Sequence, residues 1–103
     1  MTRRQLLRAR ARRLRSQMRK LGSMMQGSVI YRRMKCGKLN CRCARGYPHI
    51  FLCVTYKEKG KTQTVYVNKN LEAEALLLSR NHKKYKLLLK ELTKVNLEIL
   101  KSR

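Results

Sequence analysis

The sequence has no aspartate, and glutamate is its only acidic residue type, present five times: Glu58, Glu72, Glu74, Glu91 and Glu98. Magnesium-dependent nucleases and transposases need clustered carboxylates to hold their metal ions. No such cluster is present, because the only close pair of glutamates falls at the predicted start of a helix. The H-x-E and P-C-x-x-C pattern of zinc deaminases is also missing. We therefore predict that the protein is not an enzyme.

Long apolar runs are absent as well. No stretch approaches the roughly 20 apolar residues that cross a bilayer, so we expect no membrane partner. Residues 1–22 lack the apolar core of a secretory signal, although their arginine content also resembles a mitochondrial transit peptide. Four cysteines without a secretory signal favour a reducing compartment, and we expect the protein in the cytoplasm.

Positive charge is abundant: 27 Lys and Arg residues against five acids give a net charge of +22. Such a chain repels itself unless a polyanion neutralises it, so the expected partner is a nucleic acid. No helix-turn-helix or two-Cys, two-His finger spacing is visible. Cations lie on both predicted helices and on a loop rather than on one face. This spread favours a structured RNA over DNA.

Residues 2–26 are predicted to form a basic helix, because apolar residues recur with 4-3-4-3-4 spacing. This seam comprises Leu7, Ala11, Leu14, Met18, Leu21 and Met25. The other faces carry nine cations that we expect to contact phosphates: Arg3, Arg4, Arg8, Arg10, Arg12, Arg13, Arg15, Arg19 and Lys20.

One small antiparallel sheet is predicted, with strands at residues 28–35, 50–56 and 62–67. A turn at 57–61 joins the last two strands, and Gly60 is expected to take a positive φ there. A long helix follows from Leu71 to about Lys101, with Asn70 as its N-cap. Its predicted seam is Leu71, Ala75, Leu78, His82, Tyr85, Leu89, Leu92, Asn96 and Ile99. This helix could contact other proteins or a second copy of the chain.

The predicted fold class is α+β: an N-terminal basic helix, a three-stranded antiparallel sheet with a Cys/His metal loop, and a long C-terminal helix. Residues 1–26 form the basic arm, and residues 27–103 form a single small domain. Within that domain we place the metal loop at 36–49, the hairpin at 50–67 and the long helix at 70–102.

The stretch CGKLNCRCARGYPH holds three cysteines and a histidine within fourteen residues. Zn²⁺ prefers four Cys or His ligands in a tetrahedron, and this stretch could supply them from Cys36, Cys41, Cys43 and His49. Cys53 is an alternative fourth ligand. Reduced buried thiols or a disulfide remain alternatives, since cysteine connectivity is not readable from sequence.

Further predicted nucleic-acid contacts lie on the first strand and the metal loop. They are Arg32, Arg33, Lys35, Lys38, Arg42, Arg45 and Tyr47. Aromatic rings beside arginines suit stacking on unpaired bases. We expect Tyr47 to be exposed, whereas Phe51 and Tyr66 are expected to belong to the small core.

At the cysteine motif the sequence resembles a family of small prokaryotic proteins without an assigned activity. Its members carry CGK-x-x-C-x-C-A-x-G-x-x-H, a Tyr-containing hairpin ending near GK-T-x-x-x-Y-V, and a long helix. The matching residues are Cys36–Gly37–Lys38, Cys41 to Gly46, His49, Gly60–Lys61–Thr62 and Tyr66–Val67. Members usually have Gly-Pro-Tyr after the histidine, where this chain has Ile50–Phe51–Leu52. Because the family often occurs near mobile elements, the resemblance implies a nucleic-acid context.

Together these features predict a non-catalytic, RNA-binding subunit of a ribonucleoprotein. Two alternatives are a DNA-binding accessory or regulator of a mobile element, and a coiled-coil adaptor for an acidic protein.

Overall fold

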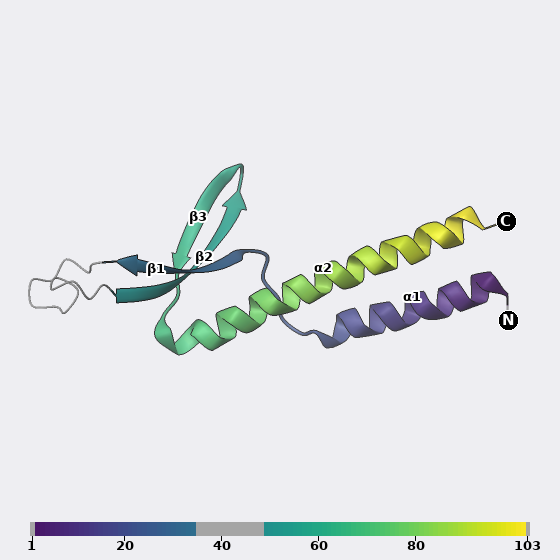
Figure 1. Cartoon of the computed structure of the whole chain (residues 1–103), viewed down its shortest axis with the longest axis horizontal. Coiled ribbons are helices and arrows are strands. Elements are labelled where there is room, and N and C mark those ends of the chain that lie inside the picture. Colours follow the sequence, from purple (N-terminus) through teal and green to yellow (C-terminus); the bar gives the residue numbers. More distant parts are fainter. Residues whose placement is uncertain (1, 35–48, 103) are drawn as a thin grey trace, which may run out of the picture. The chain divides into compact units, whose positions relative to one another are not determined.

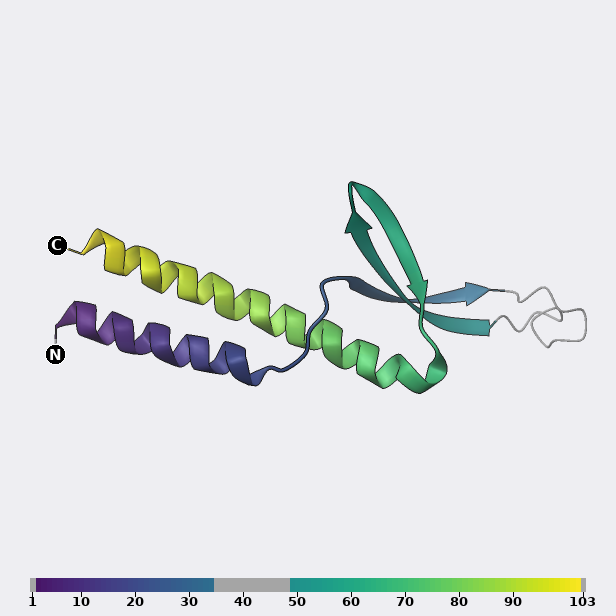
Figure 2. The ribbon, with the colours of Figure 1, turned by 180° about the vertical axis from the view of Figure 1, so that it is seen from behind.

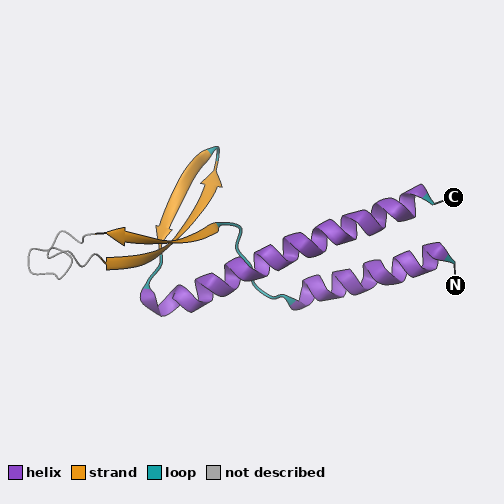
Figure 3. Ribbon diagram, in the orientation of Figure 1, coloured by secondary structure: helices purple, strands orange, loops and turns teal. Residues whose placement is uncertain are grey.

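The computed structural model describes residues 2–34 and 49–102 and has an α+β fold (Figure 1). A helix at each end of the chain flanks three strands (Figure 3). The elements are α1 (Arg3–Lys20), β1 (Ser28–Met34), β2 (His49–Glu58), β3 (Lys61–Tyr66), the short 3₁₀ helix η2 (Lys69–Leu71) and α2 (Glu72–Lys101). The predicted class, the antiparallel sheet and the two helices are confirmed.

The chain divides into two compact units. A helical unit contains residues 1–25 and 80–103, and a sheet unit contains residues 26–79. The first eight residues of α2 belong to the sheet unit. The predicted division into an arm and a single domain of residues 27–103 remains a prediction. No helix in the described ranges is long and apolar enough to cross a membrane.

The sheet has the order β1-β2-β3, and both strand pairs are antiparallel. The β2–β3 turn is made by Lys59 and Gly60, whose φ angles are 52° and 80°. Positive φ at both central residues is typical of a type I′ turn, which matches the twist of a two-residue hairpin. The predicted positive φ of Gly60 is therefore confirmed. On the other side of β2, Met34 is the Cα partner of His49.

The centre of β2 forms the core of the sheet unit. Leu52 and Cys53 are fully buried and Val54 is 5% exposed. Since successive residues of a strand point to opposite faces, both faces of the sheet are covered at the centre of β2. Gly27 lies close to this strand. A Cβ at Gly27 would come within 3.0 Å of Val54 Cγ1 and 3.2 Å of the Thr55 carbonyl oxygen. The absence of a side chain at residue 27 thus permits this close approach.

Helix α1 has a well-defined start and end. Thr2 is its N-cap: the Thr2 hydroxyl accepts from the Gln5 backbone N–H, and the Gln5 side chain accepts from the Thr2 backbone N–H. The helix ends at Lys20, six residues before the predicted end, so the prediction that Met25 continues the helical seam is wrong. The reason is Gly22, whose φ of 78° is incompatible with a continuing right-handed helix.

In the helical unit, α1 lies alongside the C-terminal part of α2 in both views (Figures 1 and 2). Six buried or half-buried residues of α2 here are spaced 4-3-4-3-4: Asn81, Tyr85, Leu88, Leu92, Val95 and Ile99. His82, Glu91 and Glu98 are half-buried beside this seam. The predicted seam is correct at Tyr85, Leu92 and Ile99. It is wrong at the exposed Leu89 and Asn96, because Leu88 and Val95 occupy the inward positions instead.

Asn81 is the polar centre of this contact. It is 8% exposed, and its side-chain amide donates hydrogen bonds of 2.8 Å to the carbonyl oxygens of Leu21 and Ser23. These bonds fix the chain as it leaves α1. The sequence predicted His82 and Asn96, not Asn81, as the polar residues of the seam. Asn68 is the N-cap of η2, the 3₁₀ helix that precedes α2, since the Asn68 side chain accepts from the Asn70 N–H. The predicted N-cap, Asn70, lies within η2.

We predict that Asn81→Asp destabilises the helical unit by about 2 kcal/mol or more, because a carboxylate cannot donate to the two carbonyl oxygens. Chemical denaturation followed by circular dichroism measures the change. Asn96→Asp is the control for the added charge, since Asn96 is exposed on the same helix and a carboxylate beside Arg8, Arg12 and Arg15 is not expected to destabilise it. Equal stability of the two variants would contradict the role given to Asn81.

We predict that Gly27→Ala destabilises the protein by about 1–3 kcal/mol, the usual range for overpacking a closely packed site. The added methyl group would press on Val54 and on the Thr55 carbonyl oxygen. Thermal unfolding measures this destabilisation, with Gln26→Ala at the adjacent exposed position as the control. An unchanged melting temperature for Gly27→Ala would show that this approach is not tight in solution.

Candidate nucleic-acid interface

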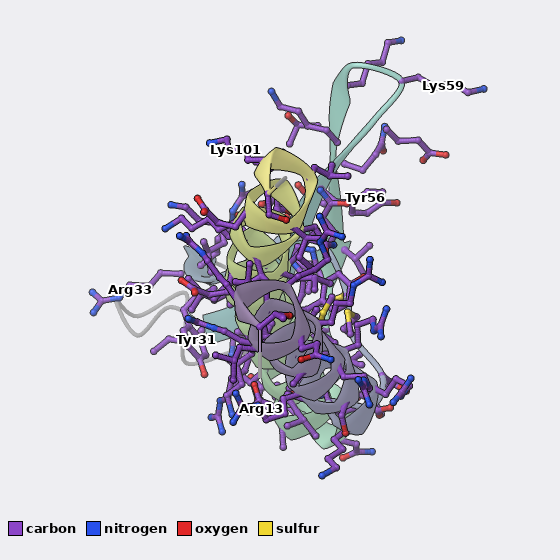
Figure 4. All side chains as sticks on the ribbon, turned by 90° about the vertical axis from the view of Figure 1, so that its right-hand side faces the viewer. Arg13, Tyr31, Arg33, Tyr56, Lys59 and Lys101 are labelled. Carbon is purple, nitrogen blue, oxygen red and sulfur yellow. The ribbon has the colours of Figure 1, made fainter. Side chains whose placement is uncertain are left out.

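All nine cations predicted to contact phosphates on the first helix lie on the surface of α1. They are distributed around the helix: Arg13, labelled in Figure 4, is two residues and thus about 200° around the axis from the buried Ala11. No acidic residue lies in the first turn of α1, although the helix dipole favours one there. The helix is therefore a dense positive surface with few local counter-charges.

One flank of α1 is paired with acids from α2. Arg3 lies 2.9 Å from Glu98, and Arg10 lies 3.2 Å from Glu91. Arg4 donates to the hydroxyl and carbonyl oxygens of Ser102, both at 3.4 Å. Each exposed ion pair contributes only about 0–1 kcal/mol to stability, but together the two fix which side of α1 faces the acids. We call Arg3, Arg10, Glu91 and Glu98 the paired flank.

The opposite flank has a groove lined by arginines without such partners. Arg8, Arg12 and Arg15 line a hollow of about 290 Å³, together with Ala11, Asn96 and Ile99.

A second hollow, of about 450 Å³, continues from Arg15 to Arg19 along Met18, Tyr85 and Leu92. Within the described ranges, no ion pair involves Arg8, Arg12, Arg15 or Arg19. We call these four residues the open flank.

Helical geometry separates the two flanks. At 3.6 residues per turn, the open flank occupies an arc of roughly 60° on α1, and the paired arginines lie about 160° away from its centre. The open flank extends about 16 Å along the axis from Arg8 to Arg19. Guanidinium groups repeated along such an arc can each bind one or two phosphate oxygens.

The sheet unit places its predicted cations on two faces. Arg32 and Arg33 are both exposed, and their Cα partners on β2 are Phe51 and Ile50, respectively. Since successive strand residues point to opposite sides, one arginine projects from each face.

The three tyrosines on the described strands, Tyr31, Tyr56 and Tyr66, are also exposed. Tyr66 is 51% exposed, so the prediction that it belongs to the core is wrong; the core at β2 covers too little of the short strand β3. Phe51 is half-buried. Tyr31 is 61% exposed on β1 (Figure 4).

Most of the predicted metal loop lies outside the described residues. These positions are Lys35, Cys36, Lys38, Cys41, Arg42, Cys43, Arg45 and Tyr47. His49 is described at the start of β2, and its ring centroid lies 5.8 Å from that of Phe51. Cys53 is a buried free thiol further along the strand. No group of three potential metal ligands occurs within residues 2–34 and 49–102.

The roles of Glu91, Glu98 and Asn96 were not predicted from the sequence. A signal was present, because Arg3 and Arg10 are seven residues apart and so are Glu91 and Glu98. Residues seven apart lie on the same side of a helix, so two antiparallel helices can join both pairs. Asn96 was placed in the apolar seam, whereas it lines the groove.

A comparison with protein families places the chain in a family without an assigned function. The profile of a domain of unknown function (DUF6788) matches residues 3–76, a range that includes α1, the whole sheet and the beginning of α2. No curated protein sequence and no solved structure matches the chain. Because the profile match covers more than half of the 103 residues, the chain belongs to the DUF6788 family.

Proposed function

We propose that this protein is a non-catalytic RNA-binding subunit of a ribonucleoprotein, and that the open flank of α1 contacts the RNA backbone. The observation that carries the proposal is the asymmetry of the helical unit. Its two glutamates both lie on the paired flank, which leaves Arg8, Arg12, Arg15 and Arg19 without neutralising partners around a groove.

Phosphate binding explains this arrangement physically. Like charges three and four residues apart on a helix repel one another, and Arg8, Arg12, Arg15 and Arg19 have this spacing. A phosphate backbone would remove the repulsion and release counterions from the RNA, which adds to the affinity. The apolar residues Ala11 and Ile99 in the same hollow support the stems of the arginines while their heads remain in water.

The distribution of cations favours a folded RNA over a DNA duplex. Arg13 lies on the far side of α1, and the sheet unit separately exposes Arg32 and Arg33 on its two faces. A protein that reads one groove of a duplex needs cations on the side that faces that groove. Cations on several sides suit a protein surrounded by the backbone of a folded RNA.

The proposal is tested by removing two arginines from one flank at a time. In the Arg8→Gln/Arg15→Gln variant we expect weaker binding to a structured RNA. We also expect the slope of log K against log[salt] to fall by about 0.7–0.9 for each phosphate that the variant no longer neutralises. The matched control is Arg3→Gln/Arg10→Gln, which removes the same charge at the same spacing and keeps helix propensity.

Equal decreases in affinity for the two double variants would contradict a specific role for the open flank. Binding that favours a DNA duplex and gives a sequence-selective footprint would support the alternative of a DNA-binding regulator of a mobile element. Binding to an acidic protein that resists nuclease treatment would support the adaptor alternative.

We further propose that Cys36, Cys41, Cys43 and His49 hold a structural Zn²⁺ ion, which requires the reduced thiols of a cytoplasmic location. The register of the sheet supports this, because Met34 and His49 are Cα partners and so hold the two ends of segment 35–48 together. His49 is better placed than Cys53, which lies about 13 Å further along β2 and is fully buried.

We predict that purified protein contains one zinc ion per chain, and that Cys43→Ser loses zinc and melts at a lower temperature. Elemental analysis and thermal unfolding measure the two effects. Cys53→Ser serves as the control, since it disturbs the core and should leave the zinc content unchanged. If a folded Cys53→Ser variant also lost its zinc, Cys53 would be identified as the fourth ligand in place of His49. Absence of zinc from the wild-type protein would contradict the metal proposal.

A further inference from the structure

We propose that one face of the sheet is a stacking site for an unpaired RNA base, formed by Tyr66 and Phe51 with Arg32 beside them. The inference rests on the proposed function, because it assumes an RNA partner. It adds a second contact of a different kind, since the open flank binds phosphates and this face would bind bases.

Strand register brings the three side chains to the same face. Arg32 is the Cα partner of Phe51, and Tyr66 is the Cα partner of Cys53, two residues further along β2. Cross-strand partners point to the same side of a sheet, and so do residues two apart on one strand. Arg32 from β1, Phe51 from β2 and Tyr66 from β3 therefore share a face.

Ring packing fixes the orientation of Tyr66. The Phe51 and Tyr66 rings lie 6.3 Å apart at 85°, an edge-to-face arrangement, and His49 extends the row with its ring 5.8 Å from Phe51. Edge-to-face pairs of this kind contribute to stability beyond the area that they bury. Tyr66 is nevertheless 51% exposed, so an oriented ring is presented to solvent.

The charge of this face suits a nucleotide. Arg32 is exposed and lies directly across from Phe51, where its guanidinium can contact a phosphate or stack on a base. Glu58, the glutamate of β2, is an odd number of residues from Phe51 and therefore points to the other side of the sheet. An aromatic ring beside an arginine without an acid on the same face of β2 favours an anionic, planar ligand.

The opposite face provides the internal comparison. Tyr31 is 61% exposed there and has Leu52 as its partner on β2. Within the described residues, no ring contact involves Tyr31. A base that stacks on Tyr31 would have to order a side chain that no neighbouring described ring orients, and this ordering costs entropy. The Phe51–Tyr66 pair has already lost that entropy on folding.

The site should select unpaired bases over paired ones. A ring on a sheet can stack only on a base whose face is exposed, and duplex bases are covered by their neighbours. The probes are therefore an RNA hairpin with an unpaired loop and a blunt RNA duplex with the same number of phosphates. Tyr66→Val removes the ring and keeps a residue that favours strands.

We expect Tyr66→Val to bind the hairpin about tenfold more weakly than the wild type and the duplex equally well, the size typical of removing one base–aromatic stack. Tyr66→Phe should retain hairpin binding, because it keeps the ring. Tyr31→Val, on the other face, should bind both RNAs like the wild type. Far-ultraviolet circular dichroism and thermal unfolding verify that each variant is folded.

The outcomes separate this inference from the proposed function. Wild-type protein that binds neither RNA would overturn the proposed function. Wild-type protein that binds both, with Tyr66→Val retaining full hairpin affinity, would overturn only the stacking site. Equally weakened binding of hairpin and duplex by a folded Tyr66→Val would also overturn it, because the ring would not then distinguish unpaired bases.

Discussion

Attraction between two arginines of α1 and two glutamates of α2 determines the electrostatics of the helical unit. The unit contains only Glu91 and Glu98 as acids, and both lie within 3.2 Å of an arginine on the same flank. Because both pairs lie on one flank of α1, the arginines of the open flank remain without a counter-charge. The open flank is thus a consequence of where the acids lie. Since the few acids neutralise one side of α1, the uncompensated positive charge is concentrated on the other side.

The sheet unit shows a corresponding shortage of apolar side chains. Its central strand buries Leu52, Cys53 and Val54, while Tyr31 and Tyr66 on the neighbouring strands remain at least half exposed. A three-stranded sheet with so small a core is near the lower limit of independent stability. A small core is consistent with the metal ion proposed for the end of β1 and β2, which would add stability. The small core also leaves aromatic rings at the surface that a larger domain would bury.

The sequence predicted the order of helices and strands because local signals are strong, such as the 4-3-4-3-4 apolar spacing of the first helix and the Lys59–Gly60 turn. It did not predict features that depend on contacts between distant segments. The inward positions of α2 are Leu88 and Val95 rather than Leu89 and Asn96. The sequence could not distinguish these two sets of positions, because α2 carries leucines on several sides. The exposure of Tyr66 depends on how much surface three strands can cover. The phosphate-contacting and metal-ligating roles remain predictions.

The discontinuity of the helical unit along the chain has a consequence for folding. Residues 26–79 separate α1 from the part of α2 beside it, so joining the helices closes a long loop. Closing a flexible loop of that length costs roughly 3–4 kcal/mol in chain entropy. A sheet unit that is already folded restricts this loop and lowers the cost. Helix pairing is therefore expected to follow sheet formation in time, and a change confined to the sheet would slow the assembly of the helical unit.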